Sequence, residues 1–428
     1  MHLSATSKFV LNNLSVELRP IQKNLLSGRL TSAYIHIPFC RRRCFYCDFP
    51  ISVMGDRAHG ENSQAISHYI DVLCQEIAIT PPPASPLQTV FFGGGTPSLL
   101  STEQLAQTLN ALDQWCGLRA EAEISMEVDP GTFTLEQLQG YRRAGVNRVS
   151  VGAQAFQPEL LAACGRSHTV DQIYAAIEII QQVEFTNFSL DLISGLPNQS
   201  LEQWQDSLEA AIKLAPTHLS TYDLVIEPTT VFGRQYQPGI LPLPADETTA
   251  QMYRLAGRLL REAGYEHYEI SNYAQPGCQC CHNRVYWENR PYYGFGMGAT
   301  SYVHNQRYSR PRTRREYFQW VQSLITSGGA VACPQTTATD ILLETLMLGL
   351  RLAEGLSLKV LSQKFGSTTV ERILSCLQPY FQQGWVDLFE PYSVDSRIRL
   401  TDPEGFLFSN TVLVALWTEF DSDMAVLR

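Results

Sequence analysis

The fold is indicated by one segment near the start of the chain, Tyr34-Ile-His-Ile-Pro-Phe-Cys40-Arg-Arg-Arg-Cys44-Phe-Tyr-Cys47-Asp48-Phe49. It places three cysteines in a C-x-x-x-C-x-x-C spacing directly after an apolar, strand-like run. Soft thiolates are preferred ligands of iron–sulfur clusters. Three of them on one loop can hold three irons of a [4Fe–4S] cube. The fourth iron then stays open, which is typical of a reactive metal site rather than a structural one.

A zinc site with a distant fourth ligand is the alternative interpretation, because short C-x-x-C spacings also serve zinc. The context favours the cluster, since a second strand-like run ends in the glycines of Phe91-Phe-Gly-Gly-Gly-Thr-Pro97. A buried, inert group of cysteines is disfavoured by the three arginines at 41–43, which would make a poor core.

The composition predicts a globular protein of two or three domains, with 428 residues of which 44% are hydrophobic and 17% charged. A formal net charge of −10 argues against nucleic-acid binding. No apolar stretch approaches the length of a transmembrane helix. The 11 cysteines are unevenly placed and do not suggest a disulfide scaffold, so we expect a cytoplasmic protein in a reducing environment.

Residues 1–30 precede the first predicted strand and contain few acidic side chains. They lack the continuous apolar region of a secretory signal. We expect a disordered or loosely packed extension, with an organellar transit peptide as the alternative.

Short apolar runs alternate with helix-period segments between residues 32 and 225, which predicts a parallel sheet with outer helices. Six such units favour a partial (β/α)6 barrel over the alternative, a doubly wound sheet. The predicted strands are Ala33–Ile37, Thr89–Phe92, Glu123–Val128, Arg148–Val151, Phe188–Leu192 and Leu219–Leu224. The predicted helices are Ala65–Ile79, Thr102–Leu112, Leu135–Arg143, Val170–Val183 and Leu201–Leu214. Ser101 or Thr102 is the predicted cap of the second of these helices.

Polar residues follow these strands at their carboxyl ends, where barrels gather functional side chains. Glu127 ends the third strand, Gln154 follows the fourth, and Arg166 comes soon after it. Asp191 lies inside an apolar run, where an unpaired carboxylate would be costly. It therefore needs either a ligand or a structural arginine partner.

Together these motifs resemble the radical S-adenosylmethionine (SAM) superfamily. Over residues 32–415 the chain is similar to the oxygen-independent coproporphyrinogen III oxidase family and its heme-chaperone branch. The resemblance implies that SAM chelates the open iron of a cluster on Cys40, Cys44 and Cys47. It also implies a SAM site lined by Tyr34, Tyr46, Gly94, Gly95, Thr96, Glu127, Gln154, Arg166 and Asp191.

Three features favour the heme-chaperone branch over the oxidase. The oxidases carry a further cysteine where this chain has Phe49, and residues 1–30 do not resemble their N-terminal arm. The chain also contains His282-Asn283-Arg-Val-Tyr286-Trp287, which fits the H-N-x-x-Y-W motif that this branch associates with heme. A histidine nitrogen can ligate heme iron. A hydrogen-bonded structural role for His282 is the alternative.

Two further motifs stay open. The run Cys278-Gln-Cys280-Cys281-His282 also reads as C-x-x-C-H, a signature of covalent heme attachment, and its thiols are candidate heme or metal ligands. The arginines at 307, 310, 312, 314 and 315 are either a solvated face or a dock for heme propionates or for an acidic partner.

From residue 340 onward the pattern predicts a helical, winged-helix-like module. Its predicted elements are helices Asp340–Leu352, Ser357–Phe365 and Val370–Gln383, a hairpin of Trp385–Leu388 with Ser396–Leu400, and a helix from Gly405 to Leu413. We therefore expect a barrel over residues 31–240, an extension over 241–335 and this module over 336–428. Helix Glu247–Gly264 is predicted inside the extension.

The predicted function is heme binding and delivery to an acceptor protein, with an electron donor required if SAM is cleaved. The alternatives are oxidative decarboxylation of coproporphyrinogen III and a non-catalytic iron–sulfur or heme sensor.

Overall fold

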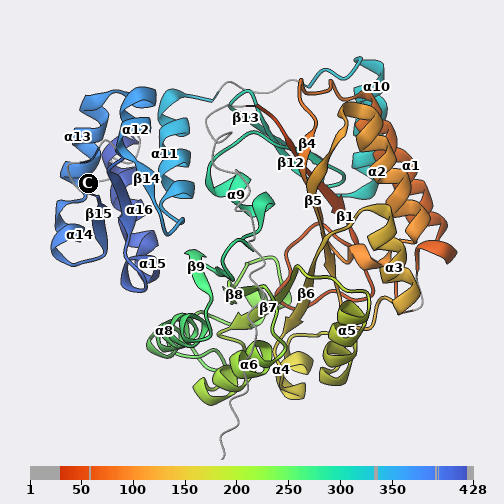
Figure 1. The fold of residues 1–428 in the computed structure, drawn as a ribbon, viewed down its shortest axis with the longest axis horizontal. Coiled ribbons are helices and arrows are strands. Elements are labelled where there is room, and N and C mark those ends of the chain that lie inside the picture. Colours follow the sequence, from red (N-terminus) through yellow and green to blue (C-terminus); the bar gives the residue numbers. More distant parts are fainter. Residues whose placement is uncertain (1–28, 57–58, 332–335, 391–392, 394, 422–428) are drawn as a thin grey trace, which may run out of the picture.

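The computed structural model describes residues 29–421, apart from 57–58, 332–335, 391–392 and 394 (Figure 1). Most of the predicted N-terminal extension, and the predicted boundary before residue 336, therefore lie outside the described residues.

Six parallel strands lie side by side in chain order and form the centre of the main sheet. They are β1 (Ser32–Ile37), β4 (Leu87–Gly94), β5 (Leu118–Val128), β6 (Arg148–Gln154), β7 (Phe188–Ser194) and β8 (His218–Asp223). These are the six predicted strands. Because neighbours in the chain are also neighbours in space, the sheet lacks the reversal of strand order that defines a doubly wound fold. The partial barrel is thus confirmed.

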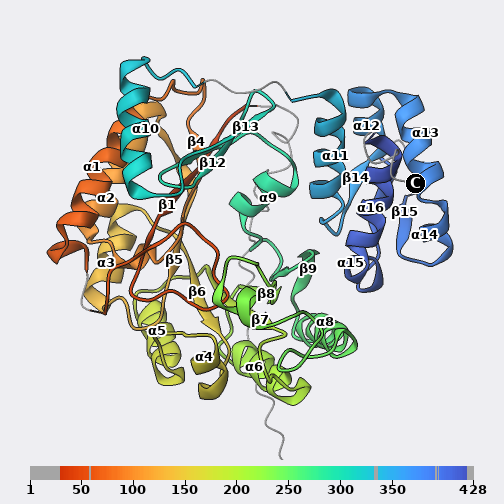
Figure 2. The ribbon, with the colours of Figure 1, turned by 180° about the vertical axis from the view of Figure 1, so that it is seen from behind.

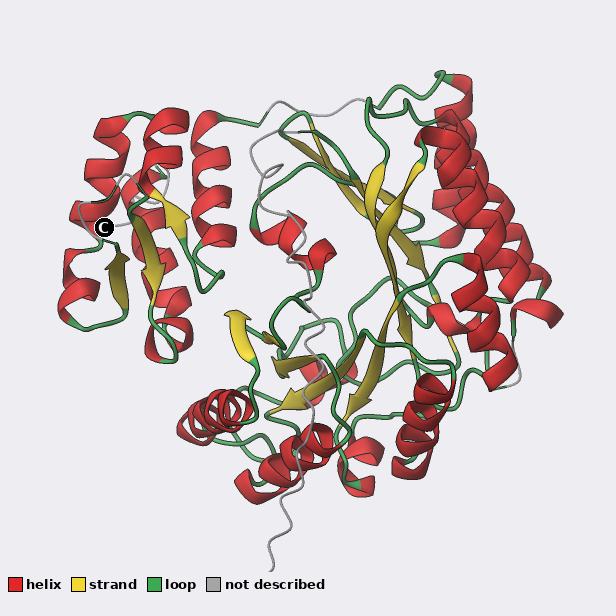
Figure 3. Cartoon of the chain, in the orientation of Figure 1, coloured by secondary structure: helices red, strands yellow, loops and turns green. Residues whose placement is uncertain are grey.

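Shorter strands extend both edges of this sheet. β11 (Tyr293–Phe295) pairs with β1 in parallel. At the other edge β10 (Asn272–Ala274) pairs with β8 and β9 (Glu266–Glu269) pairs with β10, both antiparallel. The sheet curves without closing, and its helices cover the convex face (Figure 3).

The covering helices begin where the sequence offers caps. Ser101 accepts from the backbone of Gln104 while the Gln104 side chain accepts from the backbone of Ser101, so the predicted helix start is confirmed. The helices are α1 (Gln64–Ile79), α2 (Thr102–Cys116), α3 (Leu135–Ala144), α4 (Pro158–Ala163), α5 (Val170–Gln182), α6 (Leu201–Lys213), α7 (Val231–Gln235) and α8 (Asp246–Glu262). The short α4 and α7 were not predicted.

The alternation of residues along the strands gives the barrel a polar inner face. In β5, Ile124, Met126 and Val128 belong to the main hydrophobic core, whereas Glu123 and Glu127 make polar contacts on the opposite face. Successive side chains of a strand point to opposite faces. The inner face therefore carries the chemistry and the outer face binds the helices.

The segment after β10 closes onto this inner face. It contains α9 (Cys281–Trp287), the hairpin of β12 (Thr300–Val303) and β13 (Gln306–Ser309), and α10 (Arg314–Thr326). Figures 1 and 2 show α9 on the concave side of the sheet, where it contacts β4, while α10 packs beside α1. The sequence did not predict α9 or α10.

The C-terminal part has a hydrophobic core of its own. It contains α11 (Ala338–Gly349), β14 (Leu356–Ser357), α12 (Leu358–Phe365), α13 (Ser367–Cys376), α14 (Gln378–Gln382), β15 (Val386–Phe389), β16 (Arg397–Leu400), α15 (Glu404–Leu407) and α16 (Ser409–Phe420). The predicted hairpin is present as β15 and β16, and β14 adds a third strand. The helix predicted over Val370–Gln383 is instead divided at Leu377, because Pro379 lies in the first turn of α14 and proline suits a helix start better than an interior.

Candidate cluster and SAM site

The three cysteines lie on a loop that follows β1. Cys40 ends the short strand β2 (Phe39–Cys40), which pairs with β3 (Ser52–Val53), and Cys44 and Cys47 lie in the connection between them. The loop turns back on itself, since the backbone N–H of Cys47 donates to the carbonyl of Cys44 over 3.2 Å. All three side chains line one cavity of about 480 Å³ at the carboxyl ends of the strands.

The chemistry of this donor set fits an iron–sulfur cluster. Burial raises the pKa of the Cys40 thiol to about 12 and also raises the pKa of Cys47. The protein alone therefore keeps these sulfurs protonated, and iron has to supply the positive charge that makes them thiolates. No group of three His, Cys, Asp or Glu side chains among the described residues converges on a single metal ion. A cube needs no such convergence, because each thiolate binds a different iron.

The glycine run after β4 lies against this loop. Gly94 has a φ of +108°, and a Cβ atom there would lie 2.3 Å from the His36 ring. The next two backbone N–H groups, of Gly95 and Thr96, donate to the carbonyls of Ile37 and Phe39 over 2.9 and 2.7 Å. Glycine is thus required by the approach of β4 to β1 and to the cluster loop. Gly94, Gly95 and Thr96 all line the cavity.

Two buried carboxyl groups line the same cavity. Glu127 accepts from the backbone N–H of Gly94 over 3.0 Å, and burial, reinforced by the nearby charge of Asp191, raises its pKa to about 8. Burial also raises the pKa of Asp191, although hydroxyl donors oppose the shift. One of these donors is Ser150, which lies 3.0 and 3.1 Å from the two carboxylate oxygens. Hydroxyl groups thus hydrogen-bond Asp191, and the charge of the buried Arg148 also lowers its pKa without a direct ion pair between the two described residues.

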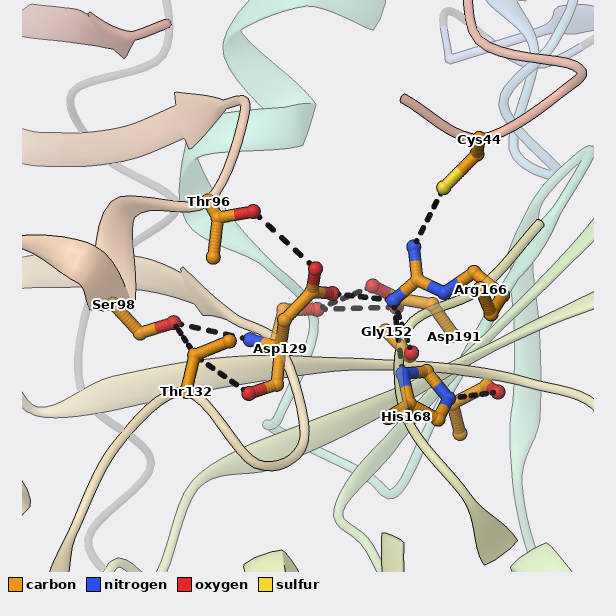
Figure 4. A network of polar contacts seen from close by, with 11 residues as sticks. Cys44, Thr96, Ser98, Asp129, Thr132, Gly152, Arg166, His168 and Asp191 are labelled. Carbon is orange, nitrogen blue, oxygen red and sulfur yellow. Dashed lines mark hydrogen bonds and ion pairs between the residues drawn. The ribbon is translucent and has the colours of Figure 1, made fainter. Parts of the chain in front are cut away.

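Arg166 links the cavity wall to the cluster loop (Figure 4). Its Nη2 lies 2.5 Å from Oδ1 of Asp129 and donates to the carbonyl of Gly152 over 3.0 Å, while Nη1 donates to Sγ of Cys44 over 3.4 Å. Asp129 also accepts from Thr96 over 3.3 Å. Sequence reasoning missed Asp129. The available signal was its place two residues after Glu127.

The remaining predicted SAM residues divide into two groups. Tyr46 and Gln154 line the cavity, and Gln154 adopts a left-handed backbone with a φ of 68°, which is uncommon outside glycine. Tyr34 does not line it. The Tyr34 hydroxyl lies 3.1 Å from Nδ1 of His36, and its ring stacks on Phe91.

The H-N-x-x-Y-W motif forms α9, and none of its four named residues lines the cavity. His282 is fully buried, with Nδ1 2.8 Å from the Thr89 hydroxyl and Nε2 2.8 Å from the Tyr286 hydroxyl. Both ring nitrogens are therefore engaged, and burial lowers the pKa of His282 to about 3. In this conformation His282 has the hydrogen-bonded structural role. Asn283 and Trp287 are partly exposed, and the Trp287 ring lies under Arg351.

The adjacent cysteines serve the same local structure. The carboxylate of Glu123 accepts from the backbone N–H groups of Cys281 and His282 over 2.9 and 3.0 Å. Cys280 is buried, and burial raises the pKa of its thiol to about 12. Unlike Cys40, Cys280 does not line the cavity, and its thiol donates to the Glu123 carboxylate over 3.6 Å.

The basic run separates into internal ion pairs and exposed side chains. Arg310 is almost fully buried and lies 2.8 Å from the equally buried Glu76, while Arg307 pairs with Glu344. The run is therefore not a single solvated face. Arg312 is exposed and donates to the carbonyl of Asp48, directly after the last cluster cysteine.

Comparisons with known proteins agree with this geometry. The model of the radical SAM superfamily matches residues 34–211, and that of the HemN C-terminal domain matches residues 336–407. A protein of Synechocystis named heme chaperone HemW is 46% identical over 404 residues, which cover 92% of this chain and 98% of that protein. Another of that name, from Bacillus subtilis, is 34% identical and covers 91% of this chain and all of its own length. The chain belongs to the HemW family of radical SAM proteins.

A solved structure supports the fold of this HemW-family chain. Coproporphyrinogen III oxidase (HemN) from Escherichia coli aligns with a TM-score of 0.76, over 92% of this chain and 91% of that one. The two sequences are 24% identical, so the likeness establishes the shared fold alone. Membership of a radical SAM family supports a [4Fe–4S] cluster and SAM as the cofactors of the cavity. Among the residues that the structure describes, no helix is both long and apolar enough to cross a membrane.

Proposed function

We propose that this chain is a heme chaperone, which binds heme and passes it to an acceptor protein while carrying SAM on a [4Fe–4S] cluster. The observation that carries the proposal is the match, over nearly the whole length of both chains, to relatives named heme chaperone HemW. Phe49 supports it, because the oxidase branch carries a cysteine at that position. The structural likeness to the oxidase extends to the fold and not to its activity.

The cavity suggests a role for each of its residues. Cys40, Cys44 and Cys47 would hold three irons of the cluster, and the amino and carboxylate groups of SAM would bind at the fourth. The cluster would supply the electron for reductive cleavage of SAM. We assign the amino group of SAM to Glu127, because a buried carboxyl with one backbone donor can accept a further hydrogen bond from the N–H groups of that amine. Asp191 is suited to the ribose hydroxyls.

Arg166 is the cation available to the SAM carboxylate. Its Nη2 is committed to Asp129 and Gly152, and its Nη1 to the sulfur of Cys44. We propose that Asp129 fixes the plane of the Arg166 guanidinium. The free edge of this group is then already oriented towards the SAM carboxylate, and the Arg166 side chain does not need to change rotamer. The aromatic ring of Tyr46 and the amide of Gln154 complete the cavity wall. Tyr34 lies behind the residues that form this wall and does not line the cavity itself.

Heme is assigned to the α9 region only through the family motif. Because both nitrogens of His282 are engaged, ligation of heme iron by His282 would require α9 to leave Thr89. We therefore propose that His282 supports α9, and that the partly exposed Asn283, Tyr286 and Trp287 are the members of the motif available to heme. We place the protein in the cytoplasm, where the cluster thiols stay reduced.

The test is made anaerobically on reconstituted protein with SAM and a reductant. Heme is supplied in one tube and coproporphyrinogen III in another, and the Soret band and protoporphyrinogen formation are followed. We expect stable heme binding without decarboxylation. Cys44→Ser should lose cluster iron and sulfide, whereas the matched variant Cys116→Ser at the end of α2 should keep both. Turnover of coproporphyrinogen III would overturn the proposal in favour of the oxidase.

A further inference from the structure

One arginine of the cluster loop and one of the basic run bind the backbone of the cluster loop. Arg43 donates to the carbonyls of Cys47, Phe49 and Ile51, and Arg312 donates to the carbonyl of Asp48 over 2.7 Å. The backbone between the last cysteine and β3 is thus held between two guanidinium groups that come from distant parts of the chain.

Two further arginines extend this basic surface. Arg314 and Arg315 begin α10, and the guanidinium of Arg314 lies 6.0 Å from the centre of the Phe39 ring, next to Cys40. Arg307 forms an ion pair with Glu344, and Arg310 forms one with Glu76. By contrast, the described part of the chain contains no carboxylate in ion-pairing distance of the four arginines at 43, 312, 314 and 315.

Exposed apolar side chains lie among these charges. Phe49 is 57% exposed and Val53 is 56% exposed. Val53 pairs with Cys40 in the short ladder of β2 and β3, so both side chains are fixed to the backbone that carries the cluster ligands. We call the surface formed by Arg43, Phe49, Val53, Arg312, Arg314 and Arg315 the cluster-loop patch. Aromatic residues and arginines are enriched where proteins bind one another.

The charge of the patch is opposite to that of the whole chain. The chain carries a formal net charge of −10, whereas the patch adds four cations. Of the neighbouring carboxylates, Asp56 forms an ion pair with Arg42 over 2.7 Å, whereas Glu316 accepts from the neutral hydroxyl of Thr313 over 2.6 Å and keeps its charge. A confined basic surface on an acidic protein selects an acidic partner and orients it during encounter.

We propose that the cluster-loop patch is the docking surface for a small, acidic, one-electron donor protein of low reduction potential. The inference rests on the proposed function, because it assumes a cluster on this loop. The docked donor gives up one electron, and the charge of the cluster falls from 2+ to 1+ without any bond being formed or broken. The patch places the donor on the backbone of the cysteine loop, and Phe49 is the one patch residue that also lines the SAM cavity.

The test measures binding of a reduced flavodoxin, an acidic flavin protein, to the cluster-loaded full-length chain by anaerobic calorimetry at low and high salt. Arg315→Glu reverses a charge whose side chain is exposed, and Arg314→Gln with Arg315→Gln removes two while keeping Arg312 on the Asp48 carbonyl. We expect both to weaken binding at low salt, by roughly three- to tenfold, and to flatten its dependence on salt. The control Arg143→Gln with Lys213→Gln removes the same charge from exposed positions on α3 and α6 and should bind normally.

Two readouts separate this inference from the proposed function. Iron and sulfide content and the spectrum after reduction by dithionite should be unchanged in the patch variants, whereas reduction by flavodoxin should slow. Heme binding should also be unchanged, and its absence from the wild type would refute the proposed function alone. The docking inference is overturned if the patch variants bind flavodoxin like the wild type, if the control weakens equally, or if the patch arginines instead control binding to vesicles of anionic phospholipid.

Discussion

Glu127 has a protonation state that depends on whether the cavity is filled. Burial raises its pKa to about 8, with Asp191 adding to the shift, so at neutral pH the carboxyl of the empty protein carries its proton. Hydrogen bonds from the N–H groups of the SAM amine favour the ionised form and lower that pKa again. Binding of SAM then releases a proton. We infer that the affinity for SAM rises with pH until about pH 8, where Glu127 is already ionised in the empty site.

The same shift gives Glu127→Gln a distinctive stability profile. The native carboxyl titrates near pH 8 and the unfolded one near 4.5, so the native state binds more protons between these values. The free energy of unfolding of the wild type therefore falls as pH rises through this window. Glu127→Gln, which cannot ionise, should be the more stable protein at pH 8 by roughly 1–3 kcal/mol and about equal near pH 4.

Denaturant unfolding of the SAM-free protein at the two pH values measures this difference. The exposed Glu136→Gln on α3 serves as the control and should follow the wild type at both. The same Glu127→Gln substitution should weaken SAM binding about tenfold, because it removes the carboxylate assigned to the amino group of SAM. A variant that is less stable than the wild type at every pH would contradict the buried, protonated carboxyl.

At the scale of elements, α9 is a helix that the sequence did not predict. Its anchors lie far away in the chain, since Thr89 is 193 residues from His282 and Glu123 lies on a different strand from Thr89. Such contacts leave no local periodicity. The six βα units were predictable because each strand buries a short apolar run and each helix repeats its apolar face within a few residues. Ser101 marked a helix start because a cap is a local signal.

The site was predictable to the same extent. The cysteines and glycines are adjacent in sequence, and the carboxyls stand out against the apolar strands that they end. The sequence could not predict which donor binds which acceptor, because these pairs depend on the register between neighbouring strands. Asp129 was missed for this reason, and so was the engagement of Arg166 with the sulfur of Cys44.

A pair of variants tests the role of α9. Thr89→Val removes the partner of Nδ1 of His282 and should destabilise the protein by about 1–3 kcal/mol, the cost of an unsatisfied buried group. His282→Ala should cost roughly 2–4 kcal/mol, because it also leaves a cavity and unpairs Tyr286. Thermal unfolding compares the two, and we expect the Soret band of bound heme to keep its position in both. A Soret shift in His282→Ala alone would make His282 a heme ligand.

At the scale of the whole molecule, the C-terminal domain meets the barrel through a charged seam. Arg254 binds Glu404 through two hydrogen bonds of 2.8 and 3.0 Å, and Arg284 lies 2.7 Å from Glu354. Arg254 and Glu404 are partly exposed, which limits what each such pair contributes. Backbone hydrogen bonds also cross the seam, from Ile270 to Arg351 and from Ala353 to Tyr268, each over 3.0 Å, so more than exposed charges holds the domain.

Asp402 is a partly buried carboxylate of this seam that binds two donors of the barrel part, and docking should depend on it. It accepts from Arg261 over 2.6 Å and from the buried ring of His267 over 2.8 Å. Burial raises the pKa of Asp402, but these two donors outweigh burial and hold the pKa below its usual value. Its contribution is thus present above the pKa of the unfolded chain and is lost as the pH falls through the lower folded value.

Asp402→Asn should loosen the C-terminal domain at neutral pH by about 1–3 kcal/mol, because it leaves the charge of Arg261 and the ring of His267 with a weaker acceptor. Hydrogen exchange of the backbone amides in residues 338–420 measures how much the C-terminal domain loosens. The difference from the wild type should shrink in acid, as the wild-type carboxyl gains its own proton. Asp387→Asn removes a partly exposed pair with Arg399 inside the domain and should leave exchange at the seam unchanged. Equal exchange in the two variants at neutral pH would mean that the seam is held by its other contacts, and that the domain docks independently of Asp402.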